Sequence, residues 1–312
     1  LAFTADLLGE AIISDPEADA YQKTCLDLLA GLAATLACAP EVPQIDRDDR
    51  GPVPRLNLSL KLTSLTPRFD ALHAETTTDL VLERLRPILR SARGLGAFVN
   101  IDMEQYAHKD LTFAIFRQVL SEDEFRDWAD VGIVCQAYLP EAEADLVQLR
   151  DWAERRGTPV AVRLVKGAYW DFEVLHARQA GWPIPVYTRK WQSDACYERC
   201  SRFLLENHAH LRPAFASHNI RSLAHALAAA ETFRVPSGSY EVQMLHGMGG
   251  PIQRALVERG IRLRVYTPYG AMLPGMAYLV RRLLENTSNE SFLKASSAAG
   301  AAADELLRNP EE

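Results

Sequence analysis

Several common signatures are missing from this sequence. No stretch is apolar for long enough to cross a bilayer, so no transmembrane span is predicted. The formal net charge is -7 and the pI is near 5.7, which argues against a nucleic-acid surface, because such surfaces cluster basic residues. The five cysteines form no CxxC pair, and an odd number without a signal peptide fits a reducing cytosol better than a disulfide framework.

Two kinds of ligand-binding motif are also missing. Cys196 and Cys200 stand one helical turn apart, but no third or fourth metal ligand lies near them in the sequence. Helix packing is therefore the favoured role for both thiols, and no metal is predicted. No GxGxxG follows the first apolar run, which disfavours a doubly wound dinucleotide-binding sheet, the alternative to a barrel.

What the sequence does contain is an alternation of short apolar runs and longer helical patterns. The chain has 312 residues, 48% hydrophobic and 24% charged, which suits a soluble chain with a large core. Eight strand-like runs, each followed by a helical pattern, predict an α/β fold of the (βα)8 TIM-barrel type. The runs are 2–10, 55–63, 97–104, 131–139, 159–167, 213–219, 240–247 and 261–268.

Polar side chains stand at or near the end of every run. In a (βα)8 barrel the carboxyl ends of the strands form the active face, so these side chains are expected to lie at one level around the barrel mouth. Each could instead be structural, because strand ends are where helix caps and loops begin. The residues are Glu10, Lys61, Asp102, Gln136, Arg163 with Lys166, His218, Gln243 with His246, and Tyr266.

The densest signal is the string RLVKGAYWD, from Arg163 to Asp171. Two cations on a buried strand predict an anionic or electron-rich partner, because an unpaired buried charge costs several kcal/mol. Gly167 lets a flat ligand approach the backbone, and the two aromatic residues after it offer stacking surfaces. Farther along, Thr188 and Lys190 fall in a polar cluster that could bind a pyrophosphate or could simply be a solvated loop.

The stretch MAYLVRRLLENTSNESF predicts a helix that carries two adjacent arginines. Tyr278, Arg281, Arg282 and Glu285 fall at i, i+3, i+4 and i+7 and share one face. Taken alone, this pattern is most often a solvated salt-bridge face. The alternative is a binding face, and the stretch by itself does not distinguish the two.

Nine strings occur in the order found in the proline dehydrogenase domain of bifunctional proline utilisation A flavoenzymes. They are SLKLTSL, NIDMEQY, VCQAYLP, RLVKGAYWD, YTRK, ASHN, LHGMG, VYTPYG and YLVRRLLEN. The chain resembles that domain from about Phe3 to Phe292. The resemblance implies a distorted (βα)8 barrel over residues 1–292, with the last helix over its C-terminal mouth. Residues 293–312 would be a stub that starts a linker in a longer parent.

The resemblance also implies a reaction: FAD-dependent oxidation of L-proline to Δ1-pyrroline-5-carboxylate, with a quinone as the electron acceptor. Arg281 and Arg282 would bind the carboxylate of proline, and Arg163 would stabilise the negative charge of the reduced flavin. The residues implied to be catalytic are Lys61, Asp102, Arg163, Tyr266, Arg281 and Arg282. The residues implied to contact the substrate are Lys61, Asp102, Leu164, Ala168, Tyr169, Leu245, Tyr266, Tyr278, Arg281 and Arg282.

The same resemblance assigns the flavin contacts. Glu285 would hold the arginines and touch the cofactor, and Ser217 replaces a threonine that is common in the family but keeps its hydroxyl group. The implied FAD contacts are Asp102, Gln136, Arg163, Val165, Lys166, Gly167, Ala168, Trp170, Thr188, Lys190, His218, Asn219, Gln243 and Glu285.

Hydride transfer needs a neutral proline amine, and no side chain is an obvious general base, so we expect the proton to leave to solvent first.

The alternative hypotheses are another barrel enzyme, such as a flavin-dependent methylenetetrahydrofolate reductase or a phosphate-binding aldolase, and a non-catalytic scaffold. The expected location is the cytoplasm, with peripheral contact at the inner face of a membrane. An aldehyde dehydrogenase domain is expected in the longer parent.

Overall fold

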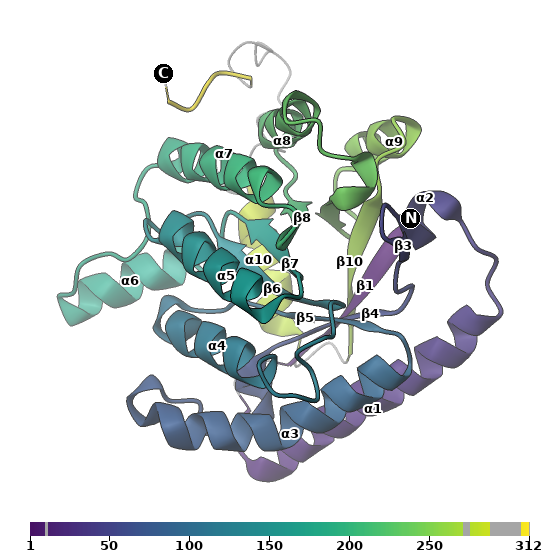
Figure 1. Cartoon of the computed structure of the whole chain (residues 1–312). Helices are drawn as coiled ribbons and strands as arrows, with labels where there is room; N and C mark the ends of the chain where they lie inside the picture. Colours follow the sequence, from purple (N-terminus) through teal and green to yellow (C-terminus); the bar gives the residue numbers. More distant parts are fainter. Residues whose placement is uncertain (10–11, 271–274, 288–306, 312) are drawn as a thin grey trace.

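The computed structural model describes residues 1–9, 12–270, 275–287 and 307–311, without the side chains of residues 277 and 284–287. In this part of the chain, eight parallel strands close into one barrel (Figure 1). The (βα)8 prediction is confirmed, and each of the eight predicted runs contains or overlaps one barrel strand. In the order of the barrel, the strands are β1 (Ala2–Leu7), β10 (Leu263–Tyr269), β9 (Glu241–Leu245), β8 (Leu211–Ala216), β7 (Val160–Val165), β6 (Val131–Gln136), β5 (Phe98–Ile101) and β4 (Asn57–Leu60).

Helices follow the barrel strands along the chain and surround the barrel (Figure 1). Between α1 and β4 the chain adds a short helix, α2 (Pro43–Asp46), and a hairpin of β2 (Arg47–Asp48) and β3 (Gly51–Pro52). The larger helices are α1 (Asp15–Ala37), α3 (Ala74–Gly94), α4 (Tyr106–Val119), α5 (Ala142–Arg156), α6 (Trp170–Ala180), α7 (Lys190–Glu206), α8 (Ile220–Thr232), α9 (Gly250–Glu258) and α10 (Met276–Thr287).

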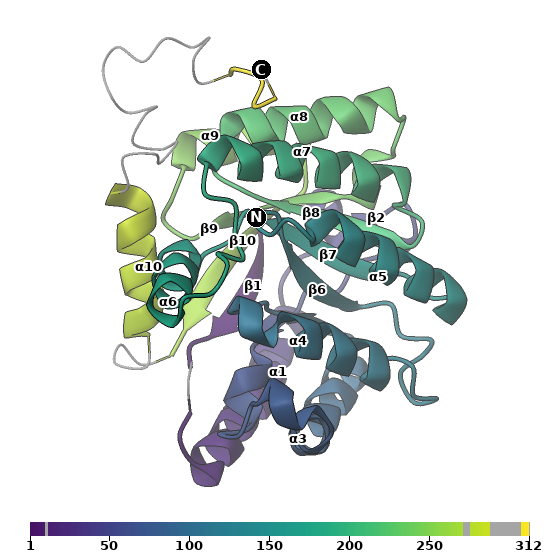
Figure 2. The same cartoon turned by 90° about the vertical axis from the view of Figure 1, so that its left-hand side faces the viewer.

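The last helix, α10, crosses the mouth of the barrel. Tyr278 of α10 stacks on Tyr266 of β10, with ring centroids 6.5 Å apart. Arg281 lies over the ring of Tyr169, the residue that precedes α6, at 5.0 Å. Figure 2 shows α10 at the side of the molecule where α6 also lies. The last helix therefore lies over the carboxyl ends of the strands, as predicted.

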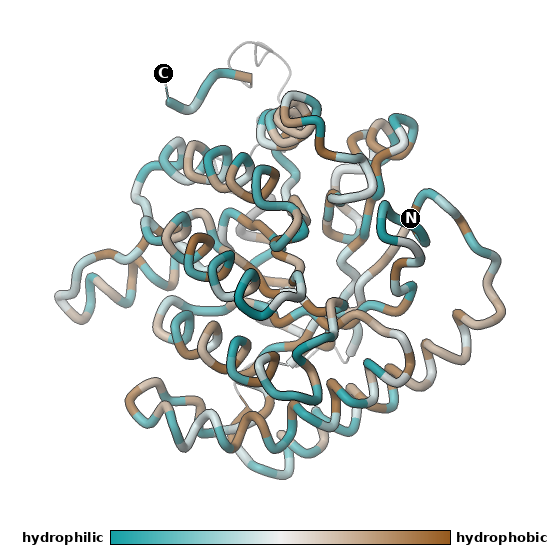
Figure 3. Tube along the Cα trace, viewed as in Figure 1, coloured by the Kyte–Doolittle hydropathy of each residue, from teal (hydrophilic) through white to brown (hydrophobic). Residues whose placement is uncertain are grey.

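The main hydrophobic core fills the space between the barrel and its helices. Alternate residues of each strand point outward, and there they meet the apolar faces of the helices. Along the helices, apolar and polar segments alternate, as expected when one face packs on the barrel and the other faces water (Figure 3). Cys196 and Cys200 are fully buried in this core, which confirms their packing role.

The inside of the barrel is polar instead. TIM barrels usually fill this space with layers of branched apolar side chains. Here Arg163 of β7 reaches across to Ser59 of β4 and Gln243 of β9, so its side chain must lie inside the barrel. Below them, Arg264 forms a double hydrogen bond with Glu241. Burying such charges is costly unless they are paired, and both arginines have a carboxylate partner: Asp102 for Arg163 and Glu241 for Arg264.

No helix in the described part of the chain is long and apolar enough to cross a membrane.

The contact between α7 and α8 predicts an acid-sensitive element of the fold. Glu198 of α7 accepts hydrogen bonds from Arg221 at 2.8 Å and lies 3.0 Å from His225 Nδ1. Burial raises the pKa of Glu198, but His225 and Arg221 outweigh that effect and bring it down to about 2. A lowered pKa means that the stabilisation is complete above the unfolded value of about 4.3 and is lost as the pH falls toward 2.

We therefore expect Glu198→Gln to lower the melting temperature at pH 6 and to have little effect near pH 2. The measurement is thermal unfolding of both proteins across this pH range. Glu206→Gln, at an exposed position of the same helix, is the control and should change little at any pH. An equal effect of Glu198→Gln at both ends of the range would contradict the assignment.

Candidate active site

A cavity of about 630 Å³ opens at the carboxyl ends of the strands, beneath α10. A volume of this size is typical of small-molecule and cofactor sites. Nearly all of the predicted site residues line it, so the folded chain brings together residues that are far apart in the sequence. They are Lys61, Asp102, Gln136, Arg163, Val165, Lys166, Gly167, Ala168, Tyr169, Trp170, Thr188, Lys190, His218, Asn219, Gln243, Leu245, Tyr266, Tyr278, Arg281 and Arg282.

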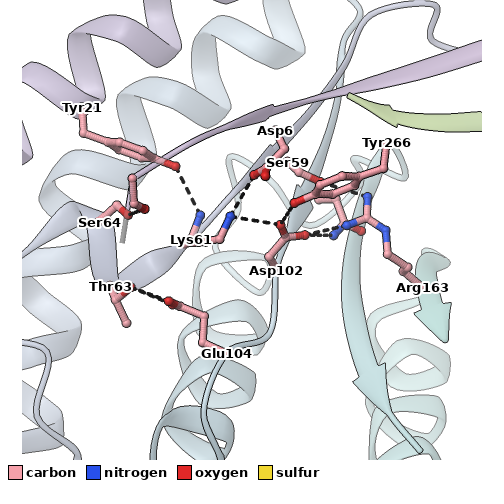
Figure 4. A network of polar contacts seen from close by, with 12 residues as sticks. Asp6, Tyr21, Ser59, Lys61, Thr63, Ser64, Asp102, Glu104, Arg163 and Tyr266 are labelled. Atoms are coloured by element: carbon pink, nitrogen blue, oxygen red, sulfur yellow. Dashed lines mark hydrogen bonds and ion pairs between the residues drawn. The ribbon is translucent and has the colours of Figure 1, made fainter. Parts of the chain in front are cut away.

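Asp102 is the centre of a buried polar network at the base of this cavity (Figure 4). Its Oδ1 accepts a hydrogen bond from Arg163 Nη1 at 2.5 Å, and its Oδ2 accepts one from the Tyr266 hydroxyl at 2.8 Å. Burial raises the pKa of Asp102, but Arg163, Lys61 and Tyr266 together lower it below its usual value. Asp102 is therefore a carboxylate at neutral pH.

Lys61 and Tyr266 complete the network from opposite sides. Lys61 Nζ lies 2.8 Å from Asp6 Oδ1 and 3.6 Å from Asp102 Oδ2. Burial disfavours its ammonium group, but the surrounding Tyr266, Asp6 and Asp102 outweigh this and raise the pKa of Lys61 well above its usual value. Burial and Asp102 likewise raise the pKa of Tyr266, so its hydroxyl group stays protonated. Lys61 and Arg163 thus present fixed positive charge to the cavity.

The arginine pair of α10 forms the opposite wall of the cavity. Arg281 and Arg282 are half-buried and line the cavity. The Arg281 guanidinium lies over the ring of Tyr169, and that of Arg282 lies 5.2 Å from the ring of Tyr278. Each guanidinium group thus lies against one aromatic ring, which favours its position by a cation–π contact. This wall can bind a carboxylate while the polar network holds the base of the cavity.

A second end of the cavity is suited to phosphate groups. Lys166, just after β7, and Lys190, at the start of α7, both pair with Asp194. Burial lowers the pKa of Lys166 to about 8, and Asp194 only partly offsets this. The amino end of α8 also faces this region, where Asn219 caps the helix and lines the cavity. Helix amino termini and lysines are common phosphate ligands.

Two features next to β6 and β7 fit a flat heterocycle. Gln136 Nε2 donates to the carbonyl of Glu104, whereas Gln136 Oε1 is buried and has no hydrogen-bond partner among the described residues. An acceptor in that state is suited to an N–H group of a bound ring. Gly167 has φ +138°, and a Cβ atom there would lie 2.4 Å from the ring of Tyr138. The backbone at Gly167 thus leaves no room for a side chain next to the cavity.

We expect Gly167→Ala to reduce binding of the flavin that the family resemblance implies, because its methyl group must displace the Tyr138 ring, which lines the cavity. The measurement is the flavin-to-protein ratio after saturation with the cofactor. Gly157→Ala is a matched control: Gly157 also has positive φ, +74°, but no heavy atom lies within 4 Å of the added methyl group. Both variants should lose about 1 kcal/mol of stability or more. Equal flavin binding by both would contradict the steric argument.

One predicted contact does not line the cavity, and two residues expected at the barrel mouth, Glu10 and the side chain of Glu285, lie outside the described residues. Leu164 does not line the cavity; its side chain is fully buried in the core around the barrel. The reason is strand alternation, since Arg163 points inward and its neighbour must point outward. The backbone of Glu285 belongs to α10, but its side chain is outside the described part, so its predicted role stays a prediction.

Sequence reasoning missed several residues that shape the site. Tyr138 lines the cavity next to Gly167, and Asp194 pairs with both Lys166 and Lys190 at the end of the cavity that is suited to phosphate groups. Asp194 was visible as the residue four positions after Lys190 on a predicted helix. Asp6 and Ser59 contact Lys61 and Arg163 from the barrel interior. Only the closed barrel reveals those two contacts.

The fold and the cavity are those of an α/β-barrel enzyme, with two arginines at the mouth of the cavity and a buried polar network at its base. Comparison with known proteins identifies the family. A profile of the family described as proline dehydrogenase matches residues 1–295, and the chain belongs to this family. The family is one of flavin-dependent oxidoreductases.

Similar proteins include both long and short relatives. The chain is 32% identical to the bifunctional protein PutA of Salmonella typhimurium over 99% of its own length and 23% of that protein. It is 30% identical to proline dehydrogenase 1 of Bacillus subtilis subsp. natto over 94% of its own length and 81% of that protein. The crystal structure of PutA from Bdellovibrio bacteriovorus, inactivated by N-propargylglycine, superposes with a TM-score of 0.97 at 48% identity. It matches 99% of this chain and 32% of that one. The chain thus spans about a quarter of the length of the curated PutA relatives that it matches.

Proposed function

We propose that this chain oxidises L-proline to Δ1-pyrroline-5-carboxylate with FAD as cofactor, the first step of proline catabolism. The observation that carries the proposal is the arrangement of the cavity: the arginine pair of α10 on one wall, and the Asp102 network at the base. Family membership supports the same activity. Between the wall and the base, the aromatic rings of Tyr266 and Tyr278 are stacked. They limit the space that is left for a small ring.

The proposed role of the arginine pair is to anchor the substrate. Arg281 and Arg282 bind the carboxylate of proline through directed N–H donors, which match its two oxygen atoms. Leu245, Tyr169, Tyr266 and Tyr278 form the wall around the pyrrolidine ring and exclude larger amino acids. The small side chain of Ala168 also lines the cavity and leaves room for the substrate beside it. These groups fix the orientation of the reacting carbon.

When bound, FAD supplies the two-electron acceptor, which takes a hydride from the proline carbon next to nitrogen. Its ring system is proposed to be held by Gln136, Val165, Gly167, Ala168, Trp170 and Gln243. Its pyrophosphate and adenosine half is proposed to be held by Thr188, Lys166, Lys190, His218 and Asn219. Arg163 and Lys61 place positive charge beside the ring, where reduction adds negative charge. The unpartnered Gln136 Oε1 supports this assignment.

The Asp102 network offers no strong general base that could accept the amine proton of proline. Asp102 accepts hydrogen bonds from Arg163 and Tyr266, and its pKa is lowered by the same neighbours. A carboxylate with a lowered pKa is a weak base. We therefore propose that proline loses this proton to solvent before hydride transfer, so the rate should rise with pH as the amine becomes neutral.

The experiment is to identify both the cofactor and the product. Purified protein is loaded with flavin, denatured to release the cofactor, and the extract is separated to distinguish FAD from FMN. The loaded protein is then incubated with L-proline and an artificial electron acceptor, and the product is identified by mass spectrometry. We expect FAD and a product with the mass of Δ1-pyrroline-5-carboxylate. Recovery of unchanged proline would contradict the proposed reaction.

Three further proposals rest on the resemblance to the family. A quinone reoxidises the flavin, and the chain makes a peripheral contact at the inner, cytoplasmic face of a membrane. An aldehyde dehydrogenase domain lies elsewhere in a longer parent. The domain division at residue 292 stays a prediction, because residues 288–306 and 312 of the proposed boundary and stub lie outside the described part.

A further inference from the structure

Asp6 is a buried carboxyl group of β1 that lies behind the proposed substrate site. Its side chain is fully buried on β1, and it is not among the residues that line the cavity. Asp6 Oδ1 lies 2.8 Å from Lys61 Nζ, the shorter of the two carboxylate contacts that Lys61 makes. The barrel register explains the contact, because Asp6 of β1 is level with Ser59 of β4, two residues before Lys61 on the same inward face.

The distances around Asp102 show what this contact does. Lys61 Nζ is 3.6 Å from Asp102 Oδ2, beyond ordinary hydrogen-bond length, while the Tyr266 hydroxyl lies 2.8 Å from that same oxygen. An ammonium group attracted to only one carboxylate would move into contact with it. Asp6 Oδ1 competes for the same ammonium group at the shorter distance of 2.8 Å, and Asp102 Oδ2 accepts its short hydrogen bond from Tyr266 instead.

The backbone of Lys61 is held as well. The amide of Lys61 donates a hydrogen bond of 3.4 Å to the hydroxyl group of Tyr21, which projects from α1. Lys61 is therefore held by Tyr21 at its amide and by Asp6 at its ammonium group. The four charges of the chain Asp6, Lys61, Asp102 and Arg163 alternate in sign, so this buried set is neutral when all are ionised.

We propose that Asp6 is a positioning residue for proline oxidation: its carboxylate keeps the Lys61 ammonium group away from Asp102, so that Asp102 orients Tyr266 and Arg163 toward the substrate. The expected effect on the rate of proline oxidation rests on the proposed function. The expected effect on the position of Lys61 does not. Asp6 itself does not line the cavity.

The kinetic test is a double-mutant cycle with Asp6→Asn and Lys61→Met. The readout is the rate of flavin reduction by L-proline in the FAD-loaded protein without oxygen, measured in a single turnover so that slow variants remain readable. Asp6→Asn should slow reduction by about tenfold in the wild-type background, because small displacements of reacting groups have effects of this order. In the Lys61→Met background the same substitution should have no effect, because Asp6 acts through Lys61.

Two more variants on β1 make the cycle specific. Asp6→Glu keeps the carboxylate and should lose less activity than Asp6→Asn; if Asp6→Asn does not fold, Asp6→Glu replaces it in the cycle. Thr4→Val is the matched control, because Thr4 is fully buried two residues earlier on the same inward face, and its hydroxyl group has no partner among the described residues. It should leave the reduction rate unchanged. An equal loss in Thr4→Val, or an Asp6→Asn effect that persists without Lys61, would overturn the proposal.

The structural test needs no substrate. In a crystal structure of FAD-loaded Asp6→Asn, the distance between Lys61 Nζ and Asp102 Oδ2 should shorten from 3.6 Å to hydrogen-bond length, and Tyr266 should move away from Asp102. An unchanged network would overturn the positioning role. If proline fails to reduce the wild-type protein, the proposed function fails, while this measurement still decides the role of Asp6.

Discussion

Replacing Arg281 or Arg282 with methionine is expected to raise the Michaelis constant for L-proline by about a hundredfold and to leave flavin content unchanged. Each arginine lies on the wall of the cavity formed by α10, with its guanidinium group over an aromatic ring. Methionine keeps much of the length and apolar character of the side chain but removes the charge and the directed donors. The loss should therefore fall on carboxylate binding.

The measurement is steady-state proline oxidation by each variant, together with its flavin-to-protein ratio. Arg254→Met, at an exposed position on α9, is the control for loss of an arginine outside the cavity. Lysine substitutions at positions 281 and 282 should recover part of the affinity, because they keep the charge without the planar pair of donors. Normal saturation by proline in both methionine variants would remove the carboxylate role from α10.

Asp102→Asn is expected to lower the rate of flavin reduction by at least about a hundredfold and to destabilise the fold by about 3 kcal/mol. The substitution leaves the buried Lys61 and Arg163 with less negative charge to balance them, and it weakens the acceptor for the Tyr266 hydroxyl group. Removing one member of a buried ion pair is costly because the remaining charge cannot return to water. The effect should thus appear in both stability and activity.

Chemical denaturation gives the stability change, and rapid mixing with proline gives the rate. The control is Asp151→Asn, which removes the partly exposed carboxylate that pairs with Arg150 at 2.6 Å. Surface pairs contribute little, so this variant should stay within about 0.5 kcal/mol of the wild type and reduce its flavin at the normal rate. A similar, small effect of both substitutions would mean that the Asp102 network neither stabilises the barrel nor orients the substrate.

The barrel could be predicted from the sequence because its period is strong and repeated. Each strand-like run is bounded by turns and followed by a helical pattern, and all eight reappear as barrel strands. The cavity was predictable for a related reason, since residues such as Lys61 and Asp102 follow strand ends, and strand ends converge in a closed barrel. The two arginines of α10 needed the family resemblance, because their local pattern equally suits a solvated helix face.

The remaining features depend on contacts between strands that are distant in sequence. Asp6 and Ser59 stand out little in their own strands, and their contacts with Lys61 and Arg163 arise only when β1, β4 and β7 surround a common interior. The family resemblance places Leu164 at the site, but the alternation of β7 turns its side chain into the outer core once Arg163 is known to point inward. Strand alternation identifies the two faces of a strand, but the closed barrel decides which face is the interior.

The most direct test of the central claim is the visible spectrum of the purified, FAD-loaded protein, recorded without oxygen before and after addition of L-proline. We predict a flavin absorption band that bleaches on addition of L-proline, which would establish cofactor, substrate and direction of electron flow together. A band that L-proline leaves unchanged would contradict the proposed reaction while leaving the fold and the flavin site intact. Failure to retain any flavin after loading would contradict the assignment of the cavity itself.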